Sequence, residues 1–162
     1  IGVDVGFFNM NGPKISLWEI CGLKRFHFVA RPYLEKATAV ILMFDNSNLQ
    51  SFNDLEEWIV LAKRHAPQGL QFYLFANTRN DGAKKVPTEI IKQLIKRRCI
   101  IDLTKLDASS TQSVYRAITN FYCKIFIPKT PAVKSNYFSR HHQSSPGTSN
   151  AKGGEIEMQV FP

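Results

Sequence analysis

The sequence has few cysteines and no long hydrophobic run. Its three cysteines, Cys21, Cys99 and Cys123, are far apart, so they form no metal-ligand spacing and leave an odd number for disulfide pairing. This pattern favours reduced thiols in an intracellular protein. The longest apolar run, Ala39 to Phe44, has the length of a strand, whereas a membrane span needs about 20 apolar residues. We therefore expect no membrane-spanning segment, and the strand-like start predicts no signal peptide.

Acidic residues are also scarce, since 13 Asp and Glu stand against 21 Lys and Arg in 162 residues, for a net charge of +8. Such an excess indicates either an anionic partner, which is nucleic acid or a membrane surface, or a solvated helix face with a basic tail. The basic residues cluster between Lys84 and Arg98 and recur near the end of the chain. No aromatic-rich RNA-binding signature or zinc-finger spacing accompanies them, which makes nucleic acid the least favoured partner.

Strand and helix patterns alternate along the chain. Strands are predicted at 3–10 and 15–18, joined by an Asn11-Gly12 turn, and at 37–44, 70–76 and 99–103. A short helix with Pro32 in its first turn, a helix capped by Ser47, a helix opened by Pro87 and a final helix over 114–125 lie between or after them. This order predicts an α/β domain with a mostly parallel sheet, and antiparallel pairing only in the opening hairpin.

Four stretches, in the same order, resemble motifs of Rab-type small GTPases of the Ras superfamily. Ile1–Asp4 resembles the segment after the first switch, and Trp18–Phe26 resembles the second-switch motif W-D-T-A-G-Q-E-R-F. The spacing of Phe44-Asp45, Ser51-Phe52 and Trp58 is similar to the family's Y-D, S-F and W, without a gap. Asn77–Asn80 falls where the guanine-reading N-K-x-D belongs.

The resemblance implies a P-loop-NTPase-like, Ras-type fold over residues 1–126, followed by a disordered basic and polar tail at 127–162. It implies GTP or GDP and Mg²⁺ as the family's ligands and protein effectors or regulators as partners. It further implies a role in vesicle traffic, in the cytoplasm and peripheral to endomembranes. The C-terminal cysteines that Rab-like proteins use for prenyl anchoring do not occur, although peripheral contact with an anionic membrane stays open.

The phosphate side departs from the family. The motif G-x-x-x-x-G-K-[ST], whose amides and Lys hold phosphates and whose hydroxyl holds Mg²⁺, does not occur, and the first-switch Thr that would precede Ile1 is absent. Glu19 stands at the second-switch Asp, beside Gly22, as a weak metal candidate acting through water. Leu23 replaces the Gln that orients the attacking water and has neither donor nor acceptor. We therefore expect weak or absent nucleotide binding and no competent catalysis.

The base side is eroded as well. Asn77 matches the family, but Thr78 replaces the Lys that lies along the base, and Asn80 replaces the Asp that takes two hydrogen bonds from guanine. A one-residue slip would let Asp81 restore the carboxylate. The last family motif, E-T-S-A-K, resembles the frame Asp102–Leu106, which includes Thr104 and Lys105 and puts Leu106 at the family's Lys.

The missing start also affects the predicted sheet. In the family, the P-loop strand lies between the strand that ends here at Trp18 and the strand at 37–44. Without it, two inner edges lose their partners, and unpaired buried backbone groups cost about 1–3 kcal/mol each. Because the chain also opens on Ile1, we interpret it as a fragment, unstable alone unless the two edges close on each other.

Three functions compete. The first is a GTP-binding Rab-like switch whose P-loop lies upstream of Ile1. The second is a pseudo-GTPase that acts through partner binding, with Phe7, Trp18, Phe26 and Phe28 as the docking residues, for which plain core packing is the rival interpretation. The third is a basic module that binds anionic lipid or nucleic acid. Losses in several separate motifs favour the second.

Overall fold

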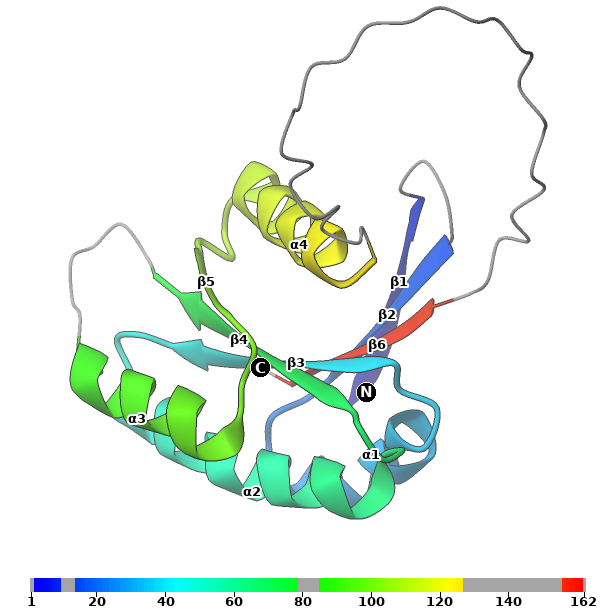
Figure 1. Ribbon diagram of the computed structural model, residues 1–162, viewed down its shortest axis with the longest axis horizontal. Coiled ribbons are helices and arrows are strands. Elements are labelled where there is room, and N and C mark those ends of the chain that lie inside the picture. The colour runs from blue at the N-terminus through cyan, green and yellow to red at the C-terminus, as the bar shows by residue number, and fades with distance from the viewer. Residues whose placement is uncertain (1, 10–13, 79–84, 127–155, 162) are drawn as a thin grey trace, which may run out of the picture.

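The computed structural model of the chain describes residues 2–9, 14–78, 85–126 and 156–161 (Figure 1). The predicted Asn11-Gly12 turn and the residues Asn80 and Asp81 lie outside this part. The strands are β1 (Val3–Asn9), β2 (Lys14–Ile20), β3 (Ala39–Asp45), β4 (Gln71–Asn77), β5 (Leu103–Leu106) and β6 (Ile156–Phe161). The helices are η1 (Lys24–Phe26), α1 (His27–Leu34), α2 (Leu49–His65), α3 (Thr88–Arg98) and α4 (Thr111–Phe126).

These strands form one sheet in the order β1-β2-β6-β3-β4-β5. The hairpin β1–β2 is antiparallel, and all the other pairs are parallel. The α/β fold with a mostly parallel sheet and an antiparallel opening hairpin is therefore confirmed.

Strand β6 fills the position that the sequence left without a strand. It lies between β2 and β3, parallel to both, with Ile15 facing Ile156 and Ala39 facing Met158 (Figure 1). The prediction of a tail without secondary structure is wrong for residues 156–161. An isolated strand of six residues shows little hydrophobic pattern, so the sequence alone does not predict a strand at Ile156–Phe161. This segment forms a strand because its backbone groups pair with those of β2 and β3. The expectation that β2 and β3 have unpaired inner edges is also wrong, because β6 pairs with both strands.

The core lies on both faces of the sheet. Helices α1, α2 and α3 cover one face, and α4 lies against the other (Figure 1). Strand β3 reads as a continuous apolar run because it is buried on both sides, with Val40, Leu42 and Phe44 facing α2 and Ala39 and Ile41 facing α4. One face of α2 is apolar, since Phe52, Leu55, Trp58, Ile59 and Ala62 recur at helical spacing and are all buried.

Two turns that lead from a strand into a helix share one hydrogen-bonding pattern. After β3, the Asp45 carboxylate accepts from the Ser47 backbone N–H at 2.8 Å, and the Ser51 hydroxyl accepts from the Asp45 N–H at 3.0 Å. After β5, Asp107, Ser109 and Ser113 repeat these bonds at the same spacing, at 2.9 Å each. Such Asx turns satisfy backbone groups where a strand ends, so both sheet-to-helix connections are held in the same way.

Three predicted boundaries are wrong. The cap of α2 is Asn48, whose side chain accepts from the Gln50 N–H at 3.0 Å, because Ser47 is already engaged by Asp45. Pro32 lies inside α1 rather than in its first turn, since the helix begins at His27 directly after η1. The last predicted strand is displaced, because Cys99 ends α3 in the left-handed conformation and β5 starts only at Leu103.

Candidate functional site

The carboxyl ends of the parallel strands gather most of the predicted nucleotide residues. Glu19, Asp45, Asn77 and Leu106 lie at or next to the ends of β2, β3, β4 and β5, respectively. Because these strands run in one direction, their carboxyl ends meet at one edge of the sheet, which is where open α/β sheets bind ligands. We call this the carboxyl edge.

Asn77 and Thr78 join β4 to the end of β5. The Asn77 side-chain oxygen accepts from the Ala108 N–H at 3.0 Å. The Thr78 N–H donates to the Leu106 carbonyl at 2.7 Å, and the Thr78 hydroxyl donates to the same oxygen at 3.2 Å. Both predicted residues therefore position the loop that follows β5, while Asn80 lies outside the described residues.

The other predicted base-site residues do not converge with Asn77. Thr104 faces Phe75, and its hydroxyl donates to the Asp102 carboxylate at 3.4 Å. Lys105 is exposed, and Leu106 is buried in the core cluster beneath α4.

The loop beside Asn77 instead contains Asp107, Ala108 and Ser109, which directly follow the Asp102–Leu106 frame. The repeated D-x-S spacing after β3 and β5 was the signal that would have located this loop.

Glu19 borders an apolar cavity of about 280 Å³ between the sheet and α4. Its lining includes Leu17, Ile41, Met43 and Leu106, and Glu19 is the one carboxylate among the described residues that line it. Mg²⁺ needs octahedral oxygen ligands, and the described residues contain no group of three or more His, Cys, Asp or Glu that could hold a metal. Because Mg²⁺ is also bound through one or two carboxylates together with water and substrate phosphates, the role of Glu19 as a ligand through water stays a prediction.

The second-switch segment is held by α2 and leaves Leu23 on the surface. The Gly22 carbonyl accepts from the Trp58 indole N–H at 3.4 Å, and the Leu23 carbonyl accepts from the Phe26 N–H at 2.8 Å. Leu23 is 52% exposed. The adjacent Lys24 ammonium is 2.6 Å from the Glu57 carboxylate, and this hydrogen bond raises the pKa of Lys24. An apolar side chain thus stands in solvent at the position of the family's Gln.

The predicted docking residues lie along one side of the hairpin and the start of α1. Phe7 and Trp18 share a face of the hairpin, because Val5 faces Trp18 and alternate residues point the same way. Phe7 is 58% exposed and carries the Lys14 ammonium 4.4 Å from its ring centre. Phe28 is 78% exposed on α1.

The other two predicted docking residues are partly buried. The Trp18 ring lies 4.9 Å from that of Tyr33, and its indole nitrogen is buried without a hydrogen-bond partner among the described residues. Phe26 lies so close to Gly2 that a Cβ added there would meet its ring at 2.8 Å. We call Phe7, Trp18, Leu23, Phe26 and Phe28 the aromatic surface; Phe7, Leu23 and Phe28 are its exposed members.

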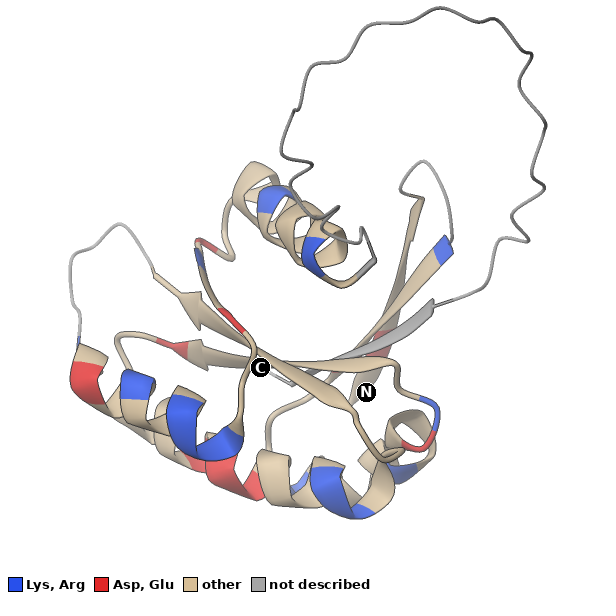
Figure 2. Cartoon of the chain, viewed as in Figure 1, with Lys and Arg blue, Asp and Glu red and all other residues tan. Residues whose placement is uncertain are grey.

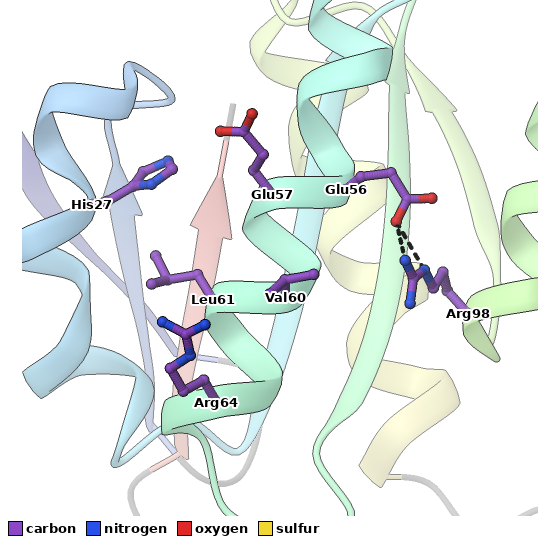
Figure 3. A pocket seen from close by; sticks show the side chains of 7 residues that line it. All are labelled: His27, Glu56, Glu57, Val60, Leu61, Arg64 and Arg98. Carbon is purple, nitrogen blue, oxygen red and sulfur yellow. Dashed lines mark hydrogen bonds and ion pairs between the residues drawn. The ribbon is translucent and has the colours of Figure 1, made fainter.

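An open depression of about 340 Å³ lies on the outer side of α2 (Figure 3). His27 of α1 and Glu57, Val60 and Arg64 of α2 line it, together with the ion pair between Glu56 and Arg98. The Glu56 carboxylate accepts from the Arg98 Nε at 2.8 Å and also pairs with Arg97. The ion pairs of Glu56 with Arg97 and Arg98 therefore attach α3 to α2 beside this depression.

Comparison with known proteins agrees with this architecture. A model of the Ras family matches residues 7–126. The chain therefore belongs to the Ras family of small GTPases. It is Rab-like, because the relatives that it matches are Rab and ypt1 proteins. Over 159 residues it is 24% identical to the GTP-binding protein ypt1 of Schizosaccharomyces pombe, covering 96% of this chain and 74% of that protein.

Two further relatives are equally distant. The chain is 25% identical to the Ras-related protein Rab-10 of Diplobatis ommata over 135 residues, which cover 81% of this chain and 67% of the relative. It is 26% identical to the Ras-related protein RABD1 of Arabidopsis thaliana over 149 residues, with 90% and 68% covered. Within the described part of the chain, no helix combines the length and the hydropathy that crossing a membrane requires.

Proposed function

We propose that this chain is a Rab-like partner-binding protein of vesicle traffic, located in the cytoplasm and peripheral to endomembranes, whose activity does not depend on hydrolysing GTP. The observation that carries the proposal is the aromatic surface, where Phe7, Leu23 and Phe28 expose apolar side chains next to the second-switch segment. Large exposed aromatics are costly in water and are characteristic of the centres of protein interfaces.

The nucleotide residues support the second half of the proposal. Leu23 offers no hydrogen bond to a water molecule, and Leu106, at the end of β5, has a buried side chain with no polar group to offer a ligand at the carboxyl edge. The Thr78 hydroxyl is already engaged as a donor to the Leu106 carbonyl. With no G-x-x-x-x-G-K-[ST] in the sequence, binding of GTP or GDP with Mg²⁺ is weak or absent in this chain.

A nucleotide titration tests this second half directly. The full chain is titrated with a fluorescent GTP analogue in the presence of Mg²⁺, and unlabelled GTP is then added as a competitor. We expect no saturable signal at micromolar concentrations, because no group holds the phosphates. Competed binding in that range would instead make the chain a nucleotide-binding switch.

A second experiment tests the docking residues. Purified effectors and regulators of Rab proteins are immobilised, and binding of the wild-type chain is compared with that of Phe28→Ser and Tyr115→Ser. Tyr115 is the matched control, since it is 56% exposed but lies on α4 on the opposite face of the sheet. For any partner that binds, Phe28→Ser should weaken binding by about tenfold or more. Equal loss in both variants would contradict docking at the aromatic surface.

A further inference from the structure

The ends of three helices meet at the edge of the sheet opposite the carboxyl edge. Helix α2 leads from the end of β3 to the start of β4, and α3 leads from the end of β4 to the start of β5. Because β3, β4 and β5 are parallel, both helices must finish at the amino-terminal edge of the sheet. Helix α4 ends there too, since Lys124 pairs with Asp102 just before β5.

Each of these three helices carries basic residues in its last turn. Figure 2 shows Lys and Arg on the last turns of α2 and α3. The cations are Lys63 and Arg64 on α2, Lys96, Arg97 and Arg98 on α3, and Lys124 on α4. Two carboxylates pair with three of them, namely Glu56 with Arg97 and Arg98, and Asp102 with Lys124. Six cations against two carboxylates leave an excess of four positive charges, and we call this group the basic edge.

Cations at helix ends are expected to some extent, since they complement the helix dipole. That effect accounts for a residue or two on each helix, but it does not account for an exposed aliphatic side chain among them. Ile101 is 52% exposed. Its N–H donates to the Phe72 carbonyl at 2.9 Å, while the Lys63 ammonium is 5.9 Å from the Phe72 ring and the next residue, Asp102, pairs with Lys124. The Ile101 N–H is thus bonded to the residue whose ring Lys63 approaches, and Ile101 directly precedes the carboxylate that pairs with Lys124.

We propose that the basic edge binds the surface of an anionic lipid bilayer, with Ile101 entering the boundary between headgroups and acyl chains. An exposed aliphatic residue at the same edge as these cations fits the two parts of such a surface, because the headgroups attract the charges and the boundary accepts the apolar side chain. A single-stranded nucleic acid would call for aromatic side chains on which bases stack. The exposed aromatics among the described residues are Phe7, Phe28 and Tyr115, on β1, α1 and the first half of α4.

This orientation leaves the remaining functional surfaces accessible. The carboxyl edge points away from the bilayer, because it is the opposite edge of the sheet. Leu23 and Phe28 of the aromatic surface lie near that edge, since η1 and α1 follow the end of β2. Lipid binding and partner binding can therefore occur together, and each can fail in an experiment without the other.

The test is co-sedimentation of the full chain with vesicles of phosphatidylcholine containing about one third phosphatidylserine. The double variant Arg64→Gln, Lys96→Gln removes two exposed cations for which the structure shows no carboxylate partner among the described residues. At about 1 kcal/mol per cation near an anionic surface, vesicle binding should weaken by about 30-fold. The matched control, Lys24→Gln with Lys85→Gln, makes the same change of charge near the carboxyl edge and should retain at least a third of the wild-type affinity.

Two further measurements, one on a variant of Ile101 and one with an RNA ligand, distinguish lipid binding from general attraction between charges. Ile101→Ser should weaken vesicle binding several-fold without changing the dependence on salt, because it removes only the apolar contact. Circular dichroism confirms that each variant is folded. Equal loss in the control and basic-edge variants would overturn the proposal, as would an unaffected Ile101→Ser. A single-stranded RNA oligonucleotide that binds more tightly than the vesicles through the same cations would also overturn it.

Discussion

Strand β6 should decide whether this chain folds. It faces β2 over five residues and β3 over four, so its removal exposes the inner edges of both strands. If only about four of the freed backbone groups stay buried and unpaired, at about 1–3 kcal/mol each, the loss is about 4–12 kcal/mol. A domain is typically stable by only about 5–15 kcal/mol. A chain that stops at Glu155 should therefore show no cooperative thermal transition, whereas residues 1–162 should show one.

A graded variant makes the test quantitative. Gln159 faces both Trp18 and Val40 in the ladder, and Gln159→Pro removes its backbone N–H from a central strand. At about 1–3 kcal/mol for the group left unpaired, and about 2–4 °C per kcal/mol, Tm should fall by roughly 2–12 °C. The control Gln159→Thr keeps the N–H and should leave Tm within about 2 °C.

The result that would refute this reasoning is a truncated chain, or a proline variant, that unfolds cooperatively at the wild-type Tm. It would mean that β2 and β3 do not depend on β6 for their hydrogen bonds. Measurement by circular dichroism at several protein concentrations checks that the transition is intramolecular, because a strand taken from a second chain would make Tm concentration-dependent.

Three further predictions follow from individual contacts. Gly2→Ala should destabilise more than Gly69→Ala, because both glycines have positive φ but only a Cβ at Gly2 would meet Phe26, at 2.8 Å; equal shifts in urea midpoint would contradict this. Burial raises the pKa of Tyr73, so its stability contribution is present below the unfolded pKa of about 10 and is lost as pH rises through the higher folded value. The urea midpoint of the wild type should therefore decrease between about pH 8 and about pH 10.5, and this decrease should be smaller in Tyr73→Phe. Leu23→Gln alone should not produce GTP hydrolysis in a phosphate-release assay, because the phosphate-holding loop is still lacking, and turnover above background would refute that.

Much of the fold could be predicted because local patterns agree with the tertiary environment. The buried face of α2 was readable since its apolar residues recur at the helical period. The run at Ala39–Phe44 predicted a strand covered on both faces, and the structure buries it between α2 and α4. Helix and strand ends were less predictable, because Ser47 and Asn48 are equally good caps by type and only the bond from Ser47 to Asp45 distinguishes them.

The candidate site was predicted only in outline. Residue types identified Asn77, Leu23 and Glu19 as the positions to examine, but only the structure shows that the Asn77 side chain bonds to Ala108. The exposure of Phe7 and Phe28, and the partial burial of Trp18 by Tyr33, also depend on how α1 packs on the hairpin. These are contacts between residues distant in sequence, which spacing alone does not determine.

The sequence by itself determined the Ras-type order of strands and helices and the lack of a phosphate-holding loop, because hydrophobic period and motif chemistry are local properties. Only the tertiary structure decided that Ile156–Phe161 completes the sheet between β2 and β3, and that cations from three helices meet at one edge. The physical reason is that backbone hydrogen bonds between strands and the direction of parallel crossovers are properties of the whole sheet.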